Sequence, residues 1–329
     1  MSAQLANFRV QKVVATVSVV LFVIKVAAWW LTGSVAILTD ALESTVNVIA
    51  GFISLYSLWV AAKPRDDDHP YGHGKAEFVA AAFEGSMIFI AGFIIMYEAL
   101  KNLRNPHPLE RLDQGIYLVS FTALVNFAVG WYCVRVGKKN NSLALIASGK
   151  HLQSDTYTTG GIILGLTLVL LTGWLWLDSA VAIFFGGLLV FTGYKIIRSS
   201  LAGIMDEADR ELLEKVVVRL NRERPENWVD LHNLRIIKYG SILHMDCHLT
   251  VPWYLNVNQA HAEIDELSRI VREEFGESME LFVHNDGCLD FSCRICSKSV
   301  CAVRQHPFEQ KVEWTVENIS RNTKHGLEQ

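Results

Sequence analysis

The sequence predicts an α-helical membrane protein with six transmembrane helices, followed by a C-terminal α+β domain of element order αββαβ. Two observations lead to this fold class. Of the 329 residues, 51% are hydrophobic and only 19% are charged, which is less charge than a soluble protein of this length carries. Nearly all the long apolar runs also lie before residue 200, so the two parts of the chain suit different solvents.

Six apolar segments are long enough to span a bilayer, whose core of about 30 Å needs roughly 20 helical residues. We expect no cleaved signal peptide, because residues 1–11 are polar and the first apolar run is too long. Trp29 and Trp30 end that run as interfacial residues, and Lys25, one turn earlier, is predicted to snorkel to the same interface. The six predicted spans are 12–31, 35–62, 78–103, 114–136, 142–172 and 177–199.

Basic residues are concentrated in one set of loops. The opposite set carries fewer, namely Lys101, Arg104 and Arg111 after the third span. The positive-inside rule therefore places both termini in the cytoplasm. The residues of the basic set are Lys63, Arg65, Lys75, Arg135, Lys138, Lys139, Lys195 and Arg198.

From residue 206 the composition changes to that of a soluble domain. We expect domains at 1–205 and 206–290 and a cysteine-containing tail at 291–329. The elements predicted in the second domain are a helix at 206–222, strands at 229–238 and 242–251 joined by a turn at Tyr239-Gly240, a helix at 258–275 and a strand at 279–284. The first helix has an apolar face of Leu212, Leu213, Val216, Val217 and Leu220. This order suggests helices on one face of an antiparallel sheet.

The most informative polar pair is His151 and Asp155, which stand four residues apart in the fifth span. That spacing puts both side chains on one helical face. Ionisable groups inside a bilayer are costly and by default mark an ion or proton pathway. The alternative is a hydrogen bond that merely pins two helices.

The second span carries a matching polar face. Asp40, Glu43 and Asn47 stand at i, i+3 and i+7. Facing His151 and Asp155, they would form a site of oxygen and nitrogen ligands, which suits a divalent cation such as Zn²⁺, Fe²⁺, Co²⁺ or Mn²⁺. A proton relay without metal is the competing interpretation.

A second candidate site lies in the loop after span two. Asp66, His69 and His73 place one acid and two imidazoles within eight residues, and Pro70 and Gly72 restrict the backbone between them. The pattern favours a shaped turn that holds ligands; a solvated charge run is the alternative.

The C-terminal domain is rich in histidine. Elements adjacent in a small sheet would bring these side chains together at one end, although surface histidines usually have no such role. The residues are His232, His244, His248, His261 and His284, together with Asp286.

Four cysteines follow with the spacing C-x4-C-x2-C-x4-C: Cys288, Cys293, Cys296 and Cys301. Four close cysteines in a cytoplasmic tail are typical of a closed tetrahedral zinc site. Reduced thiols without a metal are the alternative.

Several of these motifs occur together in one family. The segments AWWLTGSVAIL and DDDHPYGHGKAE, the H-x-x-x-D of His151 and Asp155, and the histidines near the C-terminus resemble the cation diffusion facilitators over residues 9 to 288. The resemblance is greatest to the bacterial zinc/ferrous-iron proton-antiporter branch. It implies six transmembrane helices plus a cytoplasmic metallochaperone-like domain, a homodimer, and a place in the bacterial inner membrane.

The resemblance also implies roles for individual residues. The transport site would be Glu43, Asn47, His151 and Asp155. The loop site would be Asp66, His69 and His73. The cytoplasmic site would be His232, His248, His261, His284 and Asp286. A charge interlock at the hinge between membrane and cytoplasmic parts would be Lys75 and Asp206.

The chain departs from the family pattern at two of these positions. The branch usually has Asp or His where this chain has Glu43, and Asp where it has Asn47. With a neutral His151, Glu43 and Asp155 supply the two negative charges that balance a dication. Either Asn47 ligates weakly or Asp40 replaces it. The four-cysteine tail is not required by the family pattern.

The function expected from the sequence is proton-coupled export of a divalent transition metal, with Zn²⁺ first and Fe²⁺, Co²⁺, Cd²⁺ or Mn²⁺ as alternatives. The metal would be both cargo and regulatory ion, and protons the counter-ion. A membrane-bound metal sensor or storage protein is the rival. We expect no enzyme, because no nucleophile–base pair or H-E-x-x-H occurs. A net charge of −4 gives no reason to expect nucleic acid.

Overall fold

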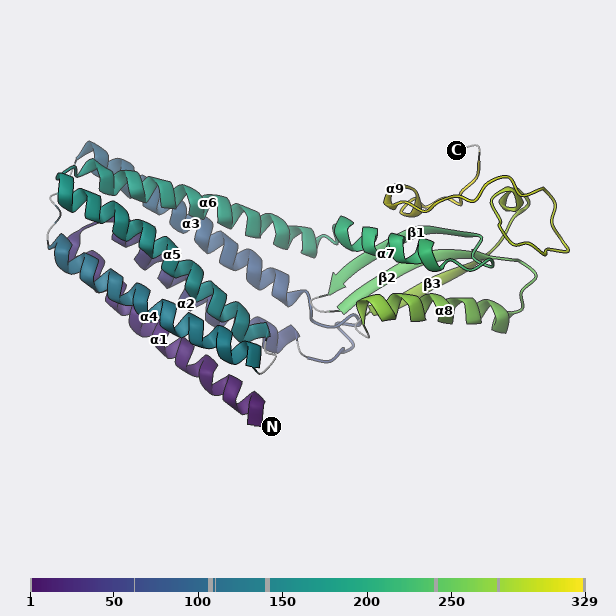
Figure 1. The fold of residues 1–329 in the computed structure, drawn as a ribbon, viewed down its shortest axis with the longest axis horizontal. Coiled ribbons are helices and arrows are strands. Elements are labelled where there is room, and N and C mark those ends of the chain that lie inside the picture. The colour runs from purple at the N-terminus through teal and green to yellow at the C-terminus, as the bar shows by residue number, and fades with distance from the viewer. Residues whose placement is uncertain are drawn as a thin grey trace. The chain divides into compact units, whose positions relative to one another are not determined.

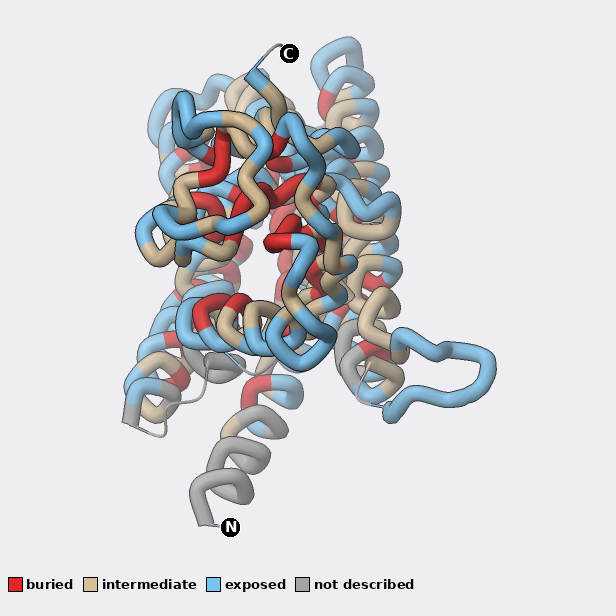
Figure 2. Tube along the Cα trace, turned by 90° about the vertical axis from the view of Figure 1, so that its right-hand side faces the viewer, coloured by how far each residue is buried: buried red, intermediate tan, exposed pale blue. Residues whose placement is uncertain are grey.

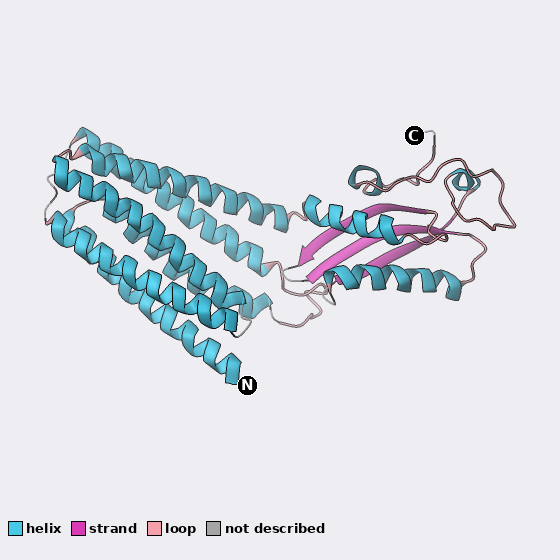
Figure 3. Cartoon of the chain, viewed as in Figure 1, coloured by secondary structure: helices cyan, strands magenta, loops and turns pink. Residues whose placement is uncertain are grey.

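The computed structural model describes residues 2–61, 63–105, 109, 111–139, 143–239, 242–276 and 279–327. It divides the chain into two compact units. We call Met1–Leu58 with Val79–Leu201 the membrane unit, and Trp59–Phe78 with Ala202–Gln329 the C-terminal unit. Figure 1 shows the elements along the chain, and Figure 3 shows that all the described strands belong to the C-terminal unit.

Among the described residues, six helices are long and apolar enough to cross a membrane, as predicted. The first helix begins well before its predicted start, because polar residues can continue a helix beyond the hydrocarbon. The helices are α1 (Ser2–Thr32), α2 (Val35–Ala61), α3 (Ala76–Arg104), α4 (Leu112–Lys139), α5 (Leu143–Thr172) and α6 (Trp176–Ile204).

Small residues let α5 and α6 approach closely. A Cβ atom placed on Gly161 would lie 2.6 Å from the Phe185 ring, and one on Gly165 would lie 2.4 Å from the Val181 side chain. These glycines therefore form a packing face against α6, as small residues do between membrane helices. A Cβ atom placed on Gly187 would meet no described atom within 4 Å, so this glycine is not required for such a close approach.

An acid from α6 holds the start of α2, the helix that carries three of the predicted site residues. Asp178 accepts hydrogen bonds from the Ser34 hydroxyl (2.5 Å) and from the backbone N–H groups of Val35 (2.9 Å) and Ala36 (3.3 Å). A carboxylate at this position satisfies amides that have no partner inside the helix and complements its dipole. The contact fixes where α2 begins relative to α6.

The C-terminal unit has the predicted αββαβ order, but its sheet is not wholly antiparallel. The strand order is β1-β2-β3; β1 pairs antiparallel with β2, whereas β3 pairs parallel with β2. The expectation of an antiparallel sheet is therefore wrong. The reason is α8, which carries the chain back across the sheet so that β3 enters in the direction of β2. The elements are α7 (Arg210–Glu223), β1 (Asp230–Tyr239), β2 (Ile242–Val251), α8 (Val257–Phe275) and β3 (Met279–Gly287).

A short 3₁₀-helix, η1 (Asp290–Arg294), and one turn of helix, α9 (Val316–Ile319), follow β3. The predicted turn at Tyr239-Gly240 includes Gly240, which lies outside the described residues. The segment after β3 is anchored to the domain, because Trp314 and Ile319 are buried in the same core as the helices and the sheet.

One face of the sheet packs on α7 and α8, which leaves the other face for polar side chains. Alternate residues of β2, Met245, Cys247, Leu249 and Val251, are buried in the helix-facing core. Because successive strand residues point to opposite faces, His244 and His248 lie on the other face. Figure 2 shows the buried residues in red. The predicted apolar face of α7 is confirmed, with Leu213, Val216, Val217 and Leu220 buried and Leu212 partly buried.

Asp209 caps α7 and yields a first testable prediction. Its side chain accepts a hydrogen bond from the Leu212 N–H (3.0 Å) and forms an ion pair with Lys238. The hydrogen bond from Lys238, followed by the one from Leu212, lowers the pKa of Asp209. A lowered pKa stabilises the fold above the usual aspartate pKa of about 4, and this contribution is lost as the pH falls below that value.

We expect Asp209→Ala to destabilise α7 by about 1 kcal/mol at pH 7, because a helix N-cap is lost. Asp209→Asn is the matched control, since asparagine also caps helices and the substitution removes only the half-exposed charge pair with Lys238. Hydrogen exchange of the α7 amides measures the stability of this helix in both variants. Equal protection of the wild type and Asp209→Ala at pH 7 would contradict the assignment.

Candidate metal sites

The structure brings together polar residues of α2 and α5 inside the membrane unit. The Asn47 amide donates a hydrogen bond to Asp155 Oδ2 (3.0 Å), and His151 Nε2 lies 3.9 Å from the same oxygen. Two ligand atoms bound to one Zn²⁺ at about 2.1 Å each lie roughly 3.4 Å apart. The gap between His151 and Asp155 is thus too long for a hydrogen bond but close to the spacing of shared metal ligands. Glu43 is half-buried, one turn before Asn47 on α2.

Asp40, the fifth residue predicted here, lies one turn before Glu43 on α2 and forms an ion pair with a lysine. Lys25 Nζ is 2.9 Å from Asp40 Oδ1, and the two side chains are 2% and 1% exposed. The prediction that Lys25 snorkels to the interface is therefore wrong. The sequence of α1 alone indicates no partner for Lys25, whereas its ammonium donates hydrogen bonds to Asp40 and Ser44 of α2.

The loop residues Asp66, His69 and His73 form one cluster in the C-terminal unit, with ligand atoms that all lie within 4.8 Å of one another. Asp66 Oδ1 is 2.8 Å from His69 Nδ1, and Asp66 Oδ2 is 3.4 Å from His73 Nε2. The turn depends on Gly72, whose φ of +89° is a conformation that glycine adopts readily. The hydrogen bond with His69 lowers the pKa of the exposed Asp66, which keeps this carboxylate ionised and able to bind a cation.

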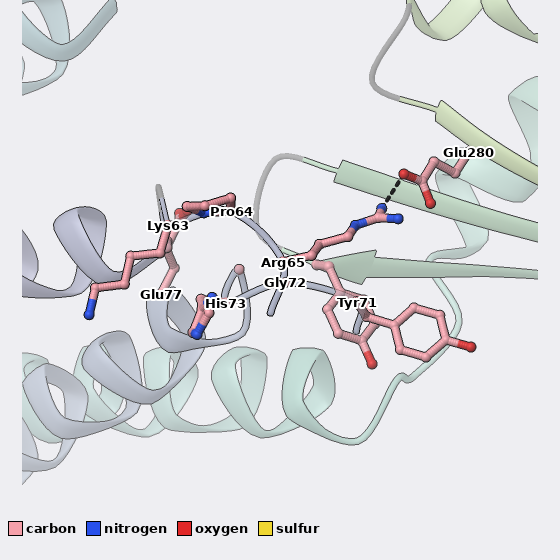
Figure 4. Close-up of a pocket in the computed structure, with 11 residues that line it drawn as sticks. Lys63, Pro64, Arg65, Tyr71, Gly72, His73, Glu77 and Glu280 are labelled. Atoms are coloured by element: carbon pink, nitrogen blue, oxygen red, sulfur yellow. Dashed lines mark hydrogen bonds and ion pairs between the residues drawn. The ribbon is translucent and has the colours of Figure 1, made fainter. Parts of the chain in front are cut away.

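A cavity of about 330 Å³ adjoins this cluster within the C-terminal unit. His73 and Tyr71 line it, and Figure 4 shows Arg65 reaching across to the ion pair with Glu280. Glu280 also lies 3.2 Å from His244 Nδ1. Burial lowers the pKa of His244, which holds this imidazole neutral. His244 thus packs beside the loop, away from the other strand histidines.

A second cluster lies on the polar face of the sheet. His232, His248 and Asp286 have ligand atoms within 4.8 Å of one another. The register explains the cluster, because His232 pairs with His248 on β2, and His248 pairs with His284 on β3. Asp286 Oδ2 lies 3.6 Å from His232 Nε2 and 3.3 Å from His248 Nδ1. Two imidazoles and a carboxylate suit a borderline metal ion such as Zn²⁺.

Two other predicted ligands of this cluster point to solvent. His284 Nδ1 is 3.1 Å from Asp286 Oδ1, but its side chain is 64% exposed. His261, near the start of α8, is 68% exposed and lies 3.7 Å from Asp265. In the described part of the chain, neither belongs to the group of three.

The chain's C-terminal segment supplies residues that sequence reasoning missed. His325 binds Asp230 through its ring and its backbone N–H (3.0 Å), and Lys324 Nζ lies 3.7 Å from Asp286. Asp230 in turn lies 3.3 Å from His232 Nδ1, which leaves Nε2 of that ring toward Asp286. Burial acts to raise the pKa of Asp230, but hydrogen bonds from His232 and His325 outweigh it and lower the pKa. No spacing motif joins positions so distant in the sequence.

Comparison with known proteins shows which family the chain belongs to. Residues 12–205 match the cation efflux transmembrane domain, and residues 208–288 match the cation efflux protein cytoplasmic domain. The chain belongs to the cation efflux family. This confirms the resemblance to the cation diffusion facilitators, whose members are transporters rather than a class of enzymes.

Curated relatives of this cation efflux protein cover most of its length. An uncharacterized transporter of Synechocystis, sll1263, is 33% identical over 250 residues, which are 76% of this chain and 81% of the relative. The cation-efflux pump FieF of Shewanella oneidensis is 29% identical over 270 residues, 81% of this chain and 89% of the relative. FieF of Salmonella typhi is 29% identical over 275 residues, 82% of this chain and 88% of the relative.

The predicted interlock residues of this family member form an ion pair. Lys75 Nζ lies 2.8 Å from Asp206 Oδ2 and 4.6 Å from the centre of the Tyr239 ring. Burial acts to lower the pKa of Lys75, but the hydrogen bond and charge of Asp206 outweigh it and raise the pKa. Both residues lie within the C-terminal unit, so the pair ties the loop after α2 to the segment after α6.

The four cysteines lie around η1 and form no disulfide bonds. The Arg304 guanidinium stabilises their loop by donating hydrogen bonds to the backbone carbonyls of Cys293 (2.8 Å), Cys296 (3.1 Å) and Lys298 (2.6 Å). Burial, and then the contact with Cys301, raises the pKa of Tyr254 to about 12. Among the described residues, the cysteines are not one of the groups whose ligand atoms lie within 4.8 Å of one another.

Proposed function

We propose that this chain exports a divalent transition-metal cation, Zn²⁺ first, from the cytoplasm in exchange for protons. The observation that carries the proposal is the contact between Asn47 of α2 and Asp155 of α5, with His151, whose side chain is 55% exposed, 3.9 Å from the same carboxylate. Ionisable side chains inside a membrane span are costly, and by default they mark an ion or proton pathway. We include Glu43 as the fourth ligand, because it lies one turn from Asn47 on the same helix.

Competition between metal and protons explains how such a site would release its ion. A metal ion binds only the neutral imidazole of His151 and the ionised carboxylates of Glu43 and Asp155. Protonation of these groups on the far side of the membrane lowers the affinity and ejects the ion. Return of the protonated site carries protons inward, so a proton gradient drives export. Histidine suits this exchange because its ordinary pKa lies near working pH.

We propose that the protein lies in a bacterial inner membrane with both termini in the cytoplasm. The basic loops support this orientation. Metal would then reach the transport site from the cytoplasm. We also propose the predicted domain limits, 1–205, 206–290 and 291–329. The Lys75–Asp206 pair would act as the hinge interlock between the first two domains.

A homodimer is the assembly that we propose, joined through the C-terminal unit. The match to a dimer-forming cytoplasmic domain supports it. His284 is exposed beside the cluster of His232, His248 and Asp286, and His261 is exposed on α8, so both remain accessible to a second copy. Metal bound there would join the two copies and report the cytoplasmic metal level to the membrane unit.

Flux in vesicles tests the proposal. The purified protein is reconstituted with a metal-sensitive dye inside, and Zn²⁺ is added outside with and without a pH gradient. The proposal requires Zn²⁺ entry that accelerates when the lumen is acidic, together with proton movement in the opposite direction. Metal flux that does not depend on the pH gradient would contradict the proposed proton coupling.

A membrane-bound metal sensor or storage protein is the second candidate. Two ligand clusters in the C-terminal unit favour it, because they could bind metal without any transport. The same vesicles separate the two functions: a sensor binds Zn²⁺ at these clusters and moves none across the membrane.

The cysteine tail provides a separate prediction about zinc content. If Cys288, Cys293, Cys296 and Cys301 close around one ion, the purified chain should hold one zinc that a mercurial reagent releases, since thiolates are its ligands. Cys296→Ser should lose that equivalent and leave the histidine clusters filled. Cys133→Ser, in α4, is the matched control. An unchanged zinc content in Cys296→Ser would favour free thiols.

A further inference from the structure

The Lys25–Asp40 pair is a deeply buried ion pair of the membrane unit that the proposed mechanism leaves unused. Lys25 lies in α1, within the apolar stretch Val13–Thr32. Its ammonium donates to Asp40 Oδ1 (2.9 Å) and to the Ser44 hydroxyl (3.0 Å) of α2, and Thr159 of α5 donates to the same Asp40 oxygen (2.7 Å). One small cluster therefore connects three helices.

The second oxygen of Asp40 has no such partner. Asp40 Oδ2 is buried, and no hydrogen bond reaches it from any described residue. A buried carboxylate oxygen without a partner is costly. It is also a free ligand atom, and only the ion pair on the other oxygen ties Asp40 to α1.

This cluster lies one helical turn from the transport site on both helices. Asp40 precedes Glu43 by three residues, and Thr159 follows Asp155 by four, so each pair shares a helix face. Freed from Lys25, the Asp40 carboxylate would be a third acid within a turn of the metal. The site would then carry three negative charges against a dication instead of two.

We propose that Lys25 is a positioning residue that sets the charge of the transport site by holding Asp40 outside the set of metal ligands. This inference rests on the proposed function, because it needs a metal bound by Glu43 and Asp155. The site keeps two carboxylates for a dication, a balance that binds the ion and still lets it leave. A third carboxylate would hold the ion more tightly and slow its release.

Lys25→Met tests this role by freeing Asp40. Zn²⁺ binding by the full-length protein in detergent is measured by competition with a chromogenic chelator. The share of the transport site is obtained by difference from the same chain with Asp155→Asn. We expect Lys25→Met to tighten Zn²⁺ binding at this site by roughly tenfold, the scale of changes around a metal's ligands. Flux in vesicles should fall by a similar factor.

Removing both charges should restore the balance. The double variant Lys25→Met with Asp40→Asn should return the Zn²⁺ affinity to within about threefold of the wild type, since replacing a buried ion pair as a unit is often tolerated. Asp40→Asn alone leaves the ammonium without a counter-charge beside the site and should weaken binding by about tenfold. If Lys25→Met does not fold, these two variants still decide the question.

A lysine that only pins helices predicts a different pattern. Unchanged or weaker Zn²⁺ binding in folded Lys25→Met would overturn the proposal, and so would a double variant as impaired as Asp40→Asn. The Lys25 result is read from binding, whereas the transport function is read from wild-type flux. Either can therefore fail without the other.

Discussion

Asp155→Asn should abolish Zn²⁺ flux in vesicles, with a loss of at least about 100-fold, or roughly 2.7 kcal/mol. Asp155 Oδ2 lies between the Asn47 amide and the His151 ring. The substitution removes one of the two carboxylates that we assign to the dication. It also places two amides against each other, so the contact with Asn47 loses its charged acceptor.

The matched control is Glu98→Gln, the same acid-to-amide change on an exposed residue of α3 that pairs with Lys101 (3.3 Å). Exposed ion pairs contribute little, so this variant should keep full flux. Binding measured alongside flux separates a lost site from a lost fold, because the clusters of the C-terminal unit should still take up metal in Asp155→Asn. Flux within a few fold of the wild type would remove Asp155 from the site.

Features that depend on a single helix or strand could be predicted from the sequence. The six helices follow from bilayer thickness, and the apolar face of α7 follows from helical periodicity. The shared face of His151 and Asp155 is likewise a property of one helix. Such patterns need no knowledge of what lies opposite.

The features that the sequence did not predict depend on contacts between two distant segments. Lys25 was assigned to the interface because its partner Asp40 lies on another helix, and nothing in α1 indicates where that helix packs. The parallel pairing of β3 is decided by the path of α8, which periodicity does not report. His325 reaches Asp230 through an irregular tail, for which no repeat predicts a position.

The candidate site divides in the same way. Spacing placed Glu43 and Asn47 on one face of α2, but it could not choose between Asn47 and Asp40 as the remaining ligand. The structure has Asn47 in contact with Asp155, and Asp40 in contact with Lys25. The sequence pattern therefore lacked one piece of information, namely which residue of the neighbouring helix each side chain contacts. These contacts decide which variants are informative.

His151→Asp should change the metal preference, with the ratio of Zn²⁺ to Mn²⁺ transport falling by about tenfold or more. Imidazole nitrogen suits Zn²⁺, whereas a site of oxygen ligands alone suits Mn²⁺. The ring lies 3.9 Å from Asp155, where it can share an ion with that carboxylate. The ratio is measured in vesicles with each metal in turn, and Cd²⁺ serves as a soft reference.

Asn47→Asp is the control that separates ligand type from charge. Both substitutions add one negative charge to the site, but only His151→Asp removes the nitrogen ligand. Asn47→Asp should tighten binding of Zn²⁺ and Mn²⁺ together, because an ionised carboxylate attracts either ion, and should leave their ratio nearly unchanged. If the two variants shifted the ratio equally, charge rather than the imidazole would set the preference, and His151 would lose its assigned role in selectivity.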